Sequence, residues 1–518
     1  MKAVLIDIPS IQSYIFGSNR LKTNIGASYI IEHLVFKEII PLVLSEMASA
    51  TWNDGRMEKW KEQPNKYLLR EDEEERVEIG YIGGGNALLI FREENFAREF
   101  VAKYSKKILE YFPGLKVAFG IGEFHYEGDA YKDCRNELTK NLQYNRNFYA
   151  LSTMPFKYGI VDDCVYSNEG QELYYRNEDK YISSLTFSKL KYLDEAKSAL
   201  SAELLKDSAS EEFTFTDDLE QFGLPEDKGY IAIVHADGNG MGKRFRECGN
   251  LSETRKLSAG VANYAKKVMS KLIEDFIAKK SDLEKTGFEF KRDEGRIILP
   301  IRPIVSGGDD LTFVCDGRLG LYLAKKLLEL MRKEEVEDDV NIEACAGVAI
   351  VHTKYPFYRA YQMTEELIRV AKKISRKDDS SWLEYFISSG GFSGNYESAF
   401  LKKYVLPSGR SLHYGPYKIG GGENDNERTF SRLEEGVRAF LKWPRHKVKE
   451  LRNVLRESEA NQKYFLETLK SHPKNLKLPF EGSLFVKVNR GGGFASYMTP
   501  YFDVIEVMDF FPEKLLST

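Results

Sequence analysis

Two adjacent aspartates, Asp309 and Asp310, follow a pair of glycines in the stretch PIVSGGDDLTFVCDG. The residues on either side alternate as in a strand, although acidic pairs are poor strand formers. The stretch therefore predicts a hairpin with carboxylates at its tip, where Gly307 and Gly308 permit a tight turn and leave room for a ligand. Asp237 ends an earlier apolar run, YIAIVHAD. Three carboxylates at one sheet edge repel one another unless a cation lies between them, and Mg²⁺ or Mn²⁺ with substrate phosphates fits this group.

The loop ADGNGMGKRF, which contains Asp237, is rich in glycine and predicts a turn from a strand into a helix. Backbone N–H groups and a helix N-terminus can face an anion at such a turn. The candidate ligand-binding residues of this loop are Gly238, Asn239, Gly240 and Gly242. In the later stretch RAYQMTEELIRVAKKIS, apolar residues recur at helical spacing and Lys372 lies outside that stripe. Lys372 is then either an ordinary solvent-facing lysine or a partner for a triphosphate.

The chain contains an internal duplication. The segment EIGYIGGGNALLIF overlays on RPIVSGGDDLTFV, so that Gly85 and Asn86 take the places of Asp309 and Asp310. Each hairpin follows a strand that ends in aspartate, and each is followed by a helical stretch and a glycine-containing strand. The other matched pairs are Asp7 with Asp237, Gly120 with Gly347, and His125 with His352. One copy of the hairpin is therefore acidic, and the other has lost its carboxylates.

Each copy reads as strand, helix, two-stranded hairpin, helix, strand and helix. This order predicts an α+β fold of two tandem ferredoxin-like (βαββαβ) domains that form a pseudo-dimer within the chain. In that fold the end of the first strand lies beside the turn of the hairpin, which would bring Asp237 to the two later aspartates. We expect the two copies at residues 1–150 and 226–400, an insert at 151–225 and a mainly helical C-terminal domain at 401–518.

The bulk composition is that of a globular protein and gives no strong pull towards a partner. The 518 residues are 42% hydrophobic and 30% charged, with a formal net charge of -4. The five cysteines are scattered without a C-x-x-C pair, so we expect neither a disulfide framework nor zinc. The N-terminus has no signal-peptide pattern and no apolar run is long enough to span a bilayer. These features predict a cytoplasmic protein with no membrane contact.

Three motifs together resemble a known family. They are D-x-N-x-x-G from Asp237 to Gly242, GGDD from Gly307 to Asp310, and the Ala371-Lys372 pair. The set looks like the palm domain shared by nucleotide cyclases, GGDEF diguanylate cyclases and the large polymerase-like subunit of type III CRISPR effectors. The CRISPR subunit is the most similar, because its members carry two palms in tandem, the first with a degenerate hairpin.

The resemblance implies a metal-dependent nucleotidyltransferase that converts ATP into short cyclic oligoadenylates for antiviral signalling. It implies that the catalytic residues are Asp237, Asp309 and Asp310, that these and Gly238 bind the metal, and that Ser258 lies near the adenine. Possible partners are CRISPR effector subunits and RNA. In this reading Lys372 and the glycine loop orient the phosphates, and the first palm holds the acceptor nucleotide.

Three departures from the family pattern limit what the resemblance implies. The chain contains no His-Asp dipeptide, so we expect no HD nuclease domain. The insert offers Cys164 where paired cysteines would hold zinc. Asn239 replaces the second acid of the usual D-x-D, which favours one bound ion over two.

Other interpretations remain open at this stage. The chain could be a catalytically inactive scaffold that binds nucleotide or RNA within a CRISPR complex, or a diguanylate-cyclase-like enzyme. Intact carboxylates favour an enzyme, because clustered unpaired charges give a scaffold no advantage. His235 and His352 lie in or beside apolar strands, and we interpret them as packed core residues rather than ligands.

Overall fold

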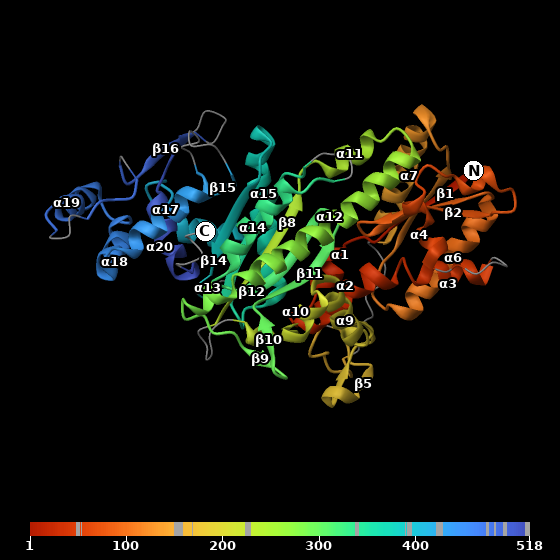
Figure 1. The fold of residues 1–518 in the computed structure, drawn as a ribbon, viewed down its shortest axis with the longest axis horizontal. Helices are drawn as coiled ribbons and strands as arrows, with labels where there is room; N and C mark the ends of the chain where they lie inside the picture. Colours follow the sequence, from red (N-terminus) through yellow and green to blue (C-terminus); the bar gives the residue numbers. More distant parts are fainter. Residues whose placement is uncertain are drawn as a thin grey trace.

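A computed structural model describes residues 1–47, 52, 54–149, 159–167, 169–222, 229–336, 341–388, 390, 396–420, 428–472, 476–480, 483–489 and 495–512. The molecule is elongated, with the N-terminal palm, the second palm and the C-terminal region following one another along its length (Figure 1). No described helix is long and apolar enough to cross a membrane.

The first palm is a four-stranded antiparallel sheet in the order β2-β3-β1-β4. Its strands are β1 (Lys2–Asp7), β2 (Val77–Gly83), β3 (Asn86–Phe91) and β4 (Ala118–Glu123). Its helices are α1 (Ile11–Phe16), α2 (Leu21–Tyr29), the π-helical turn η1 (Ile30–Leu34), α3 (Ile39–Met47), α4 (Asp54–Glu62), α5 (Leu68–Glu71), α6 (Glu94–Tyr111) and α7 (Gly128–Tyr149).

The second palm repeats this order as β11-β12-β8-β13 and extends it with β14, which is parallel to β13, and with β15. Its strands are β8 (Tyr230–Gly238), β11 (Ile301–Gly307), β12 (Asp310–Asp316), β13 (Ala344–His352), β14 (Trp382–Ile387) and β15 (Tyr417–Lys418). Its helices are α11 (Met241–Glu247), α12 (Leu251–Ala278), α13 (Lys280–Glu284), α14 (Gly320–Lys333) and α15 (Phe357–Asp378). Both sheets have the ferredoxin-like order, which confirms the predicted fold.

The segment between the palms and the C-terminal region complete the chain. The first contains β5 (Leu173–Tyr175), η2 (Arg176–Glu178), β6 (Lys180–Ile182), α8 (Ser184–Leu190), α9 (Leu193–Leu204), α10 (Asp207–Glu212), β7 (Phe213–Phe215) and η3 (Leu219–Gln221). In a small separate sheet, β7 joins β10 (Arg296–Leu299) and β9 (Arg292–Asp293). The C-terminal region contains α16 (Tyr396–Tyr404), α17 (Phe430–Leu441), α18 (Arg445–Val454), α19 (Glu459–Lys470), β16 (Val486–Asn489), β17 (Ala495–Met498), α20 (Pro500–Val507) and η4 (Met508–Phe510).

Of the three predicted domain boundaries, only the last lies within the described residues. Those at 150–151 and 225–226 lie outside the described residues. The one between residues 400 and 401 falls inside α16. Because domain boundaries belong in exposed linkers, we propose that the C-terminal region begins with that helix.

The strand registers support the duplication residue by residue. Asp7 pairs with Asn86 across β1 and β3, as Asp237 pairs with Asp310 across β8 and β12. The register shifts by a bulge between Ile79 and Tyr81 in one hairpin and between Pro303 and Val305 in the other. The matched glycines are equivalent as well, since Gly120 lies opposite Leu5 and Gly347 opposite His235. The matched aspartates and glycines therefore occupy equivalent places in the two sheets, whereas His352 ends β13 and His125 lies beyond the end of β4.

The two palms pack against each other reciprocally. The long helix α12 of the second palm reaches the first palm (Figure 1), where Arg255 pairs with Glu78. In return, α1 of the first palm packs on the second, and Phe16 stacks on Tyr361 of α15 at 3.8 Å between ring centroids. The central strand β8 is consequently buried on both faces, which explains why its sequence is a nearly continuous apolar run.

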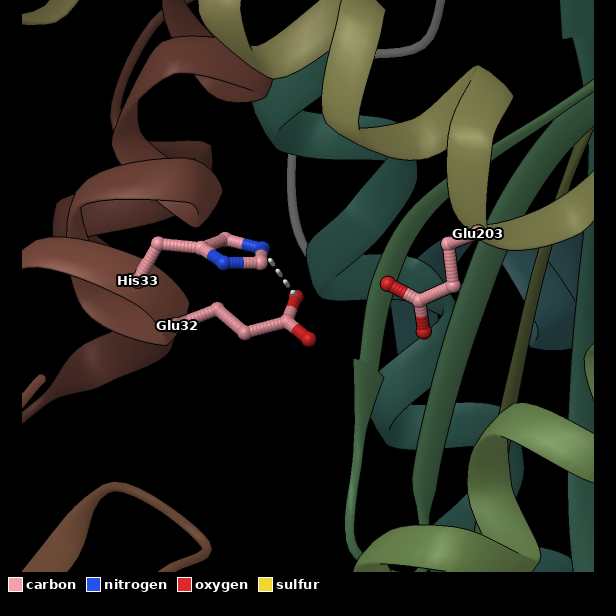
Figure 2. Close-up of side chains that lie close together, drawn as sticks. All are labelled: Glu32, His33 and Glu203. Atoms are coloured by element: carbon pink, nitrogen blue, oxygen red, sulfur yellow. Dashed lines mark ion pairs between the residues drawn. The ribbon is translucent and has the colours of Figure 1, made fainter. Parts of the chain in front are cut away.

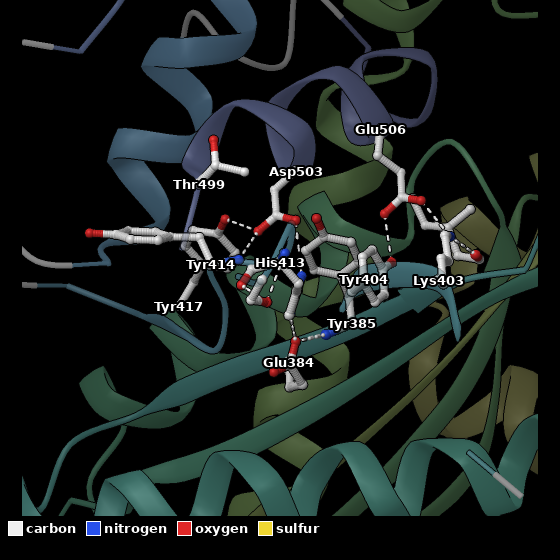
Figure 3. A network of polar contacts seen from close by, with 12 residues as sticks. Glu384, Tyr385, Lys403, Tyr404, His413, Tyr414, Tyr417, Thr499, Asp503 and Glu506 are labelled. Carbon is white, nitrogen blue, oxygen red and sulfur yellow. Dashed lines mark hydrogen bonds and ion pairs between the residues drawn. The ribbon is translucent and has the colours of Figure 1, made fainter. Parts of the chain in front are cut away.

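A buried polar network joins the C-terminal region to the second palm. His413 lies between Glu384 of β14, 2.7 Å from Nε2, and Asp503 of α20, 2.9 Å from Nδ1 (Figure 3). All three side chains are at most 1% exposed. Burial alone would lower the pKa of His413, but the two carboxylates outweigh it and raise the pKa to about 10. The network therefore contains a buried imidazolium that connects a palm strand to the last helix.

This network predicts a pH-dependent stability. Folded His413 keeps its proton up to about pH 10, whereas in the unfolded chain a histidine loses it near pH 6.5. Its contribution is therefore complete at low pH and lost as the pH rises towards 10, at up to about 1.4 kcal/mol per pH unit. Urea unfolding at pH 7, 8.5 and 10 measures this loss. The Asp503→Asn variant should show a flatter profile, and wild-type stability that rises over this range would contradict the assignment.

Candidate active site

The acidic hairpin turns through Gly308 and Asp309, between β11 and β12. Gly308 has φ +70°, while Asp309 is not among the described non-glycine residues with positive φ. The first-palm turn differs, because both Gly84 and Gly85 have positive φ, +59° and +77°. A two-residue turn that needs positive φ only at its first position accepts an aspartate at its second. The second hairpin can therefore carry a carboxylate where the first carries glycine.

Asp309 lies directly against the end of β8. Its carbonyl oxygen accepts a hydrogen bond from the Gly238 N–H at 3.1 Å. A Cβ atom at position 238 would lie 2.8 Å from the Asp309 Cβ and 3.2 Å from its Oδ2, so only glycine fits. Partial burial and the negative charge of Asp237 raise the pKa of Asp309 to about 7. The contact brings the Asp309 carboxylate beside the end of β8.

Asp310 is held from two sides. Its Oδ1 lies 2.9 Å from Nε2 of the buried His235, and its Oδ2 accepts a 3.4 Å hydrogen bond from Gln12 of α1. Burial would raise the pKa of Asp310, but the His235 charge outweighs it and lowers that pKa. Burial would likewise lower the pKa of His235, but Asp310 raises it. The two therefore form an ion pair, and the first palm contributes directly to the acidic hairpin.

Lys372 reaches Asp237 from helix α15. Its Nζ donates to Asp237 Oδ2 at 2.5 Å and to the Gly238 carbonyl oxygen at 3.3 Å. Lys372 is therefore partly buried beside Asp237, and its role as a partner for a triphosphate stays a prediction. The first palm has a counterpart, because Arg146 of α7 lies 3.4 Å from Asp7.

The remaining loop residues lie at different distances from the carboxylates. Asn239 donates through Nδ2 to Ser375 Oγ at 2.8 Å, and so faces α15. Gly240 adopts φ +76° as the N-cap of α11, and Gly242 lies in the first turn of that helix. Ser258 is buried under the first-palm hairpin, where a Cβ at Gly83 would lie 2.8 Å from its Oγ. Ser258 therefore packs where the two palms approach each other most closely.

A cavity of about 710 Å³ lies between the palms. This volume is within the range of about 300–1,000 Å³ of small-molecule sites. The tips of both hairpins line it, at Gly83–Gly85 and at 307–310, together with Asn263 and Lys266 of α12. The acidic hairpin and its degenerate copy therefore face one shared space.

The carboxylates suit a divalent cation but do not yet enclose one. Asp237, Asp309 and Asp310 are not a group whose ligand atoms all lie within 4.8 Å of one another, in the part of the chain that the structure describes. No described ion pair includes Asp309, and its pKa is raised first by burial and then by the charge of Asp237. Hard oxygen ligands of this kind are those that Mg²⁺ and Mn²⁺ prefer. The carboxylate oxygens of the three aspartates therefore suit the predicted ion, and Asp309 is the one of the three that has no described ion pair.

Two contacts of this site were missed by sequence reasoning. His235 is buried, as interpreted, but it also pairs with Asp310. Gln12 approaches the same carboxylate from the other palm. The position of His235 two residues before Asp237, on the same face of β8, was a usable signal. Nothing in the sequence indicated Gln12.

Two ferredoxin-like domains in tandem, with an acidic hairpin in the second, define a tandem-palm protein. Residues 230–381 match the family described as Cas10/Cmr2, second palm domain. These residues therefore contain a second palm of the Cas10/Cmr2 type, as the motifs indicated, and they include the acidic hairpin. No curated protein shows significant similarity to the chain.

Several solved structures of a Csm1-Csm4 cassette are similar to this chain at low identity. The alignment with the cassette in complex with cA4 has a TM-score of 0.48 at 11% sequence identity. It covers 92% of this chain and 65% of the chain in that structure. The alignment with the cassette in complex with cA3 has a TM-score of 0.48 at 12% sequence identity, and it covers 98% of this chain and 69% of the other. The alignment with the cassette in complex with one ATP has a TM-score of 0.45 at 12% sequence identity, and it covers 91% of this chain and 65% of the other. This chain thus spans less than two thirds of the length of the first of these structures.

Proposed function

We propose that this chain is a nucleotidyltransferase that joins ATP molecules into short cyclic oligoadenylates, as part of a type III CRISPR-like antiviral defence. One observation carries the proposal. The carboxylates of Asp309 and Asp310 line a cavity that both palms enclose, within a domain of the Cas10/Cmr2 second-palm family. The cavity offers room for a donor nucleotide at the acidic hairpin and an acceptor at its degenerate copy.

The reaction is transfer of an adenylyl group. The 3′-hydroxyl of the acceptor attacks the α-phosphorus of ATP, an oxygen–phosphorus bond forms, and pyrophosphate leaves. Asp237, Asp309 and Asp310, with Gly238 beside them, would hold Mg²⁺ or Mn²⁺, which would lower the pKa of the attacking hydroxyl and neutralise charge on the phosphoryl oxygens.

The protein contributes mainly orientation and charge. Lys372, held at Asp237, supplies a cation for the β- and γ-phosphates, together with the backbone of the loop that contains Gly240 and Gly242. His235 and Gln12 fix the Asp310 carboxylate. The first palm carries Asn86 where the second carries Asp310; it holds the acceptor without a metal of its own.

The direct test is incubation of the purified chain with labelled ATP and Mg²⁺ or Mn²⁺, alone and with RNA and effector subunits, followed by chromatography of the products. Cyclic oligoadenylates with release of pyrophosphate support the proposal. The absence of any adenylyl transfer under all these conditions would overturn it.

A second candidate function is an inactive scaffold within an effector complex. One observation favours it, because Lys372 already neutralises Asp237 and the three carboxylates do not converge on one point. The same incubation separates the two, since a scaffold binds ATP without releasing pyrophosphate.

The raised pKa of Asp309 predicts a pH-dependent metal affinity. Metal binding requires the ionised carboxylate, and the pKa of Asp309 is about 7 without metal. The affinity for Mn²⁺ should therefore be full above pH 8 and weaken by up to about tenfold per pH unit below 7. Calorimetric titration at pH 6, 7 and 8 measures this. Asp309→Asn should remove the dependence along with most of the binding, and an unchanged affinity at pH 6 would contradict the assignment.

A further inference from the structure

A second group of metal-ligating side chains lies apart from the aspartates, where the first palm meets the segment between the palms. Glu32 and His33 belong to η1, and Glu203 belongs to α9. One ligand atom from each lies within 4.8 Å of the other two, and all three residues are half-buried. Figure 2 shows the Glu32 and His33 side chains extending from one helix towards Glu203 on the other. Among the described residues, this is the one such group of three.

Local structure holds His33 ready for coordination. Its ring stacks on Tyr29, with centroids 4.7 Å apart and an interplanar angle of 24°. The π-helical turn Ile30–Leu34 changes the helical register here, and such turns recur at functional sites. The ring is therefore held in place beside Glu32 and Glu203.

A buried arginine opens onto the same place, and two of its nitrogen atoms have no hydrogen-bond partner. Arg302 is 1% exposed, and its Nε and Nη1 have no hydrogen-bond partner in the described structure. Together with Glu32, His33 and Glu203 it lines a cavity of about 40 Å³. That volume accommodates a water molecule or a small anion, since one water needs about 10–15 Å³ measured in this way. The unpaired donors thus indicate a ligand that is not part of the protein.

The two palms differ at this position. Arg302 lies directly before the bulge in β11, and Glu78 lies directly before the equivalent bulge in β2 of the first palm. Glu78 is fully paired with Arg255 of α12, whereas Arg302 has no described ion pair with an acid. A metal held by three side chains keeps an open coordination position. A water, hydroxide or anion in that position would accept hydrogen bonds from Arg302.

The charges around the group are consistent with a metal that carries an anionic fourth ligand. Glu32 and Glu203 together balance a divalent ion. Lys266 now pairs with Glu203 at 3.1 Å, and metal binding would displace it. Lys266, Lys37 and Arg302 would then surround the fourth ligand with positive charge.

We propose that Glu32, His33 and Glu203 bind a late first-row divalent metal ion of the Zn²⁺ type, which ties α9 to the first palm. A mixed imidazole and carboxylate set suits Zn²⁺ better than Mg²⁺. Glu32 and His33 also line the cavity between the palms, which gives the ion a path of entry. The site uses no cysteine, so the cysteine pattern could not reveal it. It does not depend on the proposed nucleotidyl transfer.

The test is titration of the metal-stripped full chain with Zn²⁺ by calorimetry, with Co²⁺ absorption as a reporter of an imidazole and oxygen ligand set. We expect one tight Zn²⁺ per chain and a Tm that rises with Zn²⁺. His33→Ala and Glu203→Gln should each weaken Zn²⁺ binding by at least about 100-fold, because even outer-shell partners of a metal contribute 10–100-fold. Glu38 is another carboxylate that lines the cavity between the palms. The Glu38→Gln variant should therefore bind Zn²⁺ as tightly as the wild type does.

The aspartate site provides the second control. Asp309→Asn should leave the Zn²⁺ titration unchanged, whatever it does to ATP turnover, which separates this site from the proposed active site. The proposal is overturned if the wild type binds no stoichiometric Zn²⁺, or if His33→Ala binds it as tightly as the wild type does.

Discussion

Asp309→Asn should reduce adenylyl transfer by at least about 1,000-fold, the upper end of what loss of one electrostatic contact in an active site costs. Asp309 is the carboxylate without a described cationic partner, and it lies against the end of β8 beside Asp237. Asparagine keeps its size and its place in the turn but removes the charge that holds the metal. Release of pyrophosphate from labelled ATP measures the loss.

The matched control lies in the other palm. Asn86→Ala alters the degenerate hairpin at the position equivalent to Asp310, and it should lower turnover by less than about tenfold, because no metal ligand is lost there. Circular dichroism should show that both variants are folded. Equal losses in the two variants would reverse the division of labour between the palms, and unchanged turnover in Asp309→Asn would remove the proposed chemistry.

Arg255→Ala should destabilise the chain by about 3–5 kcal/mol, the usual cost of breaking a buried ion pair. Arg255 and Glu78 are each 1% exposed, and their Nη2 and Oε1 atoms are 2.6 Å apart. The same guanidinium donates to the carbonyl oxygens of Ile79 and Gly80, at the bulge of the first hairpin. Removing it leaves the Glu78 carboxylate without its cation and takes a donor from four carbonyl oxygens, those of Ile79, Gly80, Pro64 and Lys66. The midpoint of urea unfolding measures the effect.

Two further variants make this prediction specific. Arg98→Ala breaks the largely exposed pair with Glu94 and should leave the midpoint of urea unfolding close to that of the wild type. Arg255→Met combined with Glu78→Gln should be more stable than Arg255→Met alone, because the double change leaves no unpaired buried charge. If Arg255→Ala unfolds at the wild-type midpoint, this ion pair does not hold the palms together.

The architecture of the two palms followed from the sequence because its signals are local. Apolar alternation, glycine turns and the repeated order of elements predicted both ferredoxin-like sheets. The duplication matched Asp7 with Asp237 and Asn86 with Asp310, and the registers place these residues at equivalent points. The placement of Asp237 beside Asp310 also followed, because the fold fixes which strand ends lie next to the hairpin turn.

The contacts of individual side chains could be predicted less well from the sequence, because most of the partners come from distant parts of the chain. Gln12 contacts Asp310 across 298 residues. Ser258 lies beneath Gly83 of the other palm, and its place near the adenine stays a prediction. The role of His235 depended on which face of β8 meets the first palm. None of these contacts has a sequence period or a spacing that could reveal it.

The sequence by itself determined the repeated fold, the acidic hairpin and its degenerate copy, because hydrogen-bonded strands and tight turns depend on neighbouring residues. Only the tertiary structure decided that Lys372 pairs with Asp237, that Gln12 and His235 hold Asp310, and that Glu32 and His33 face Glu203. The physical reason is the packing of one palm on the other. That packing selects which side chains are buried together, and no single segment encodes it.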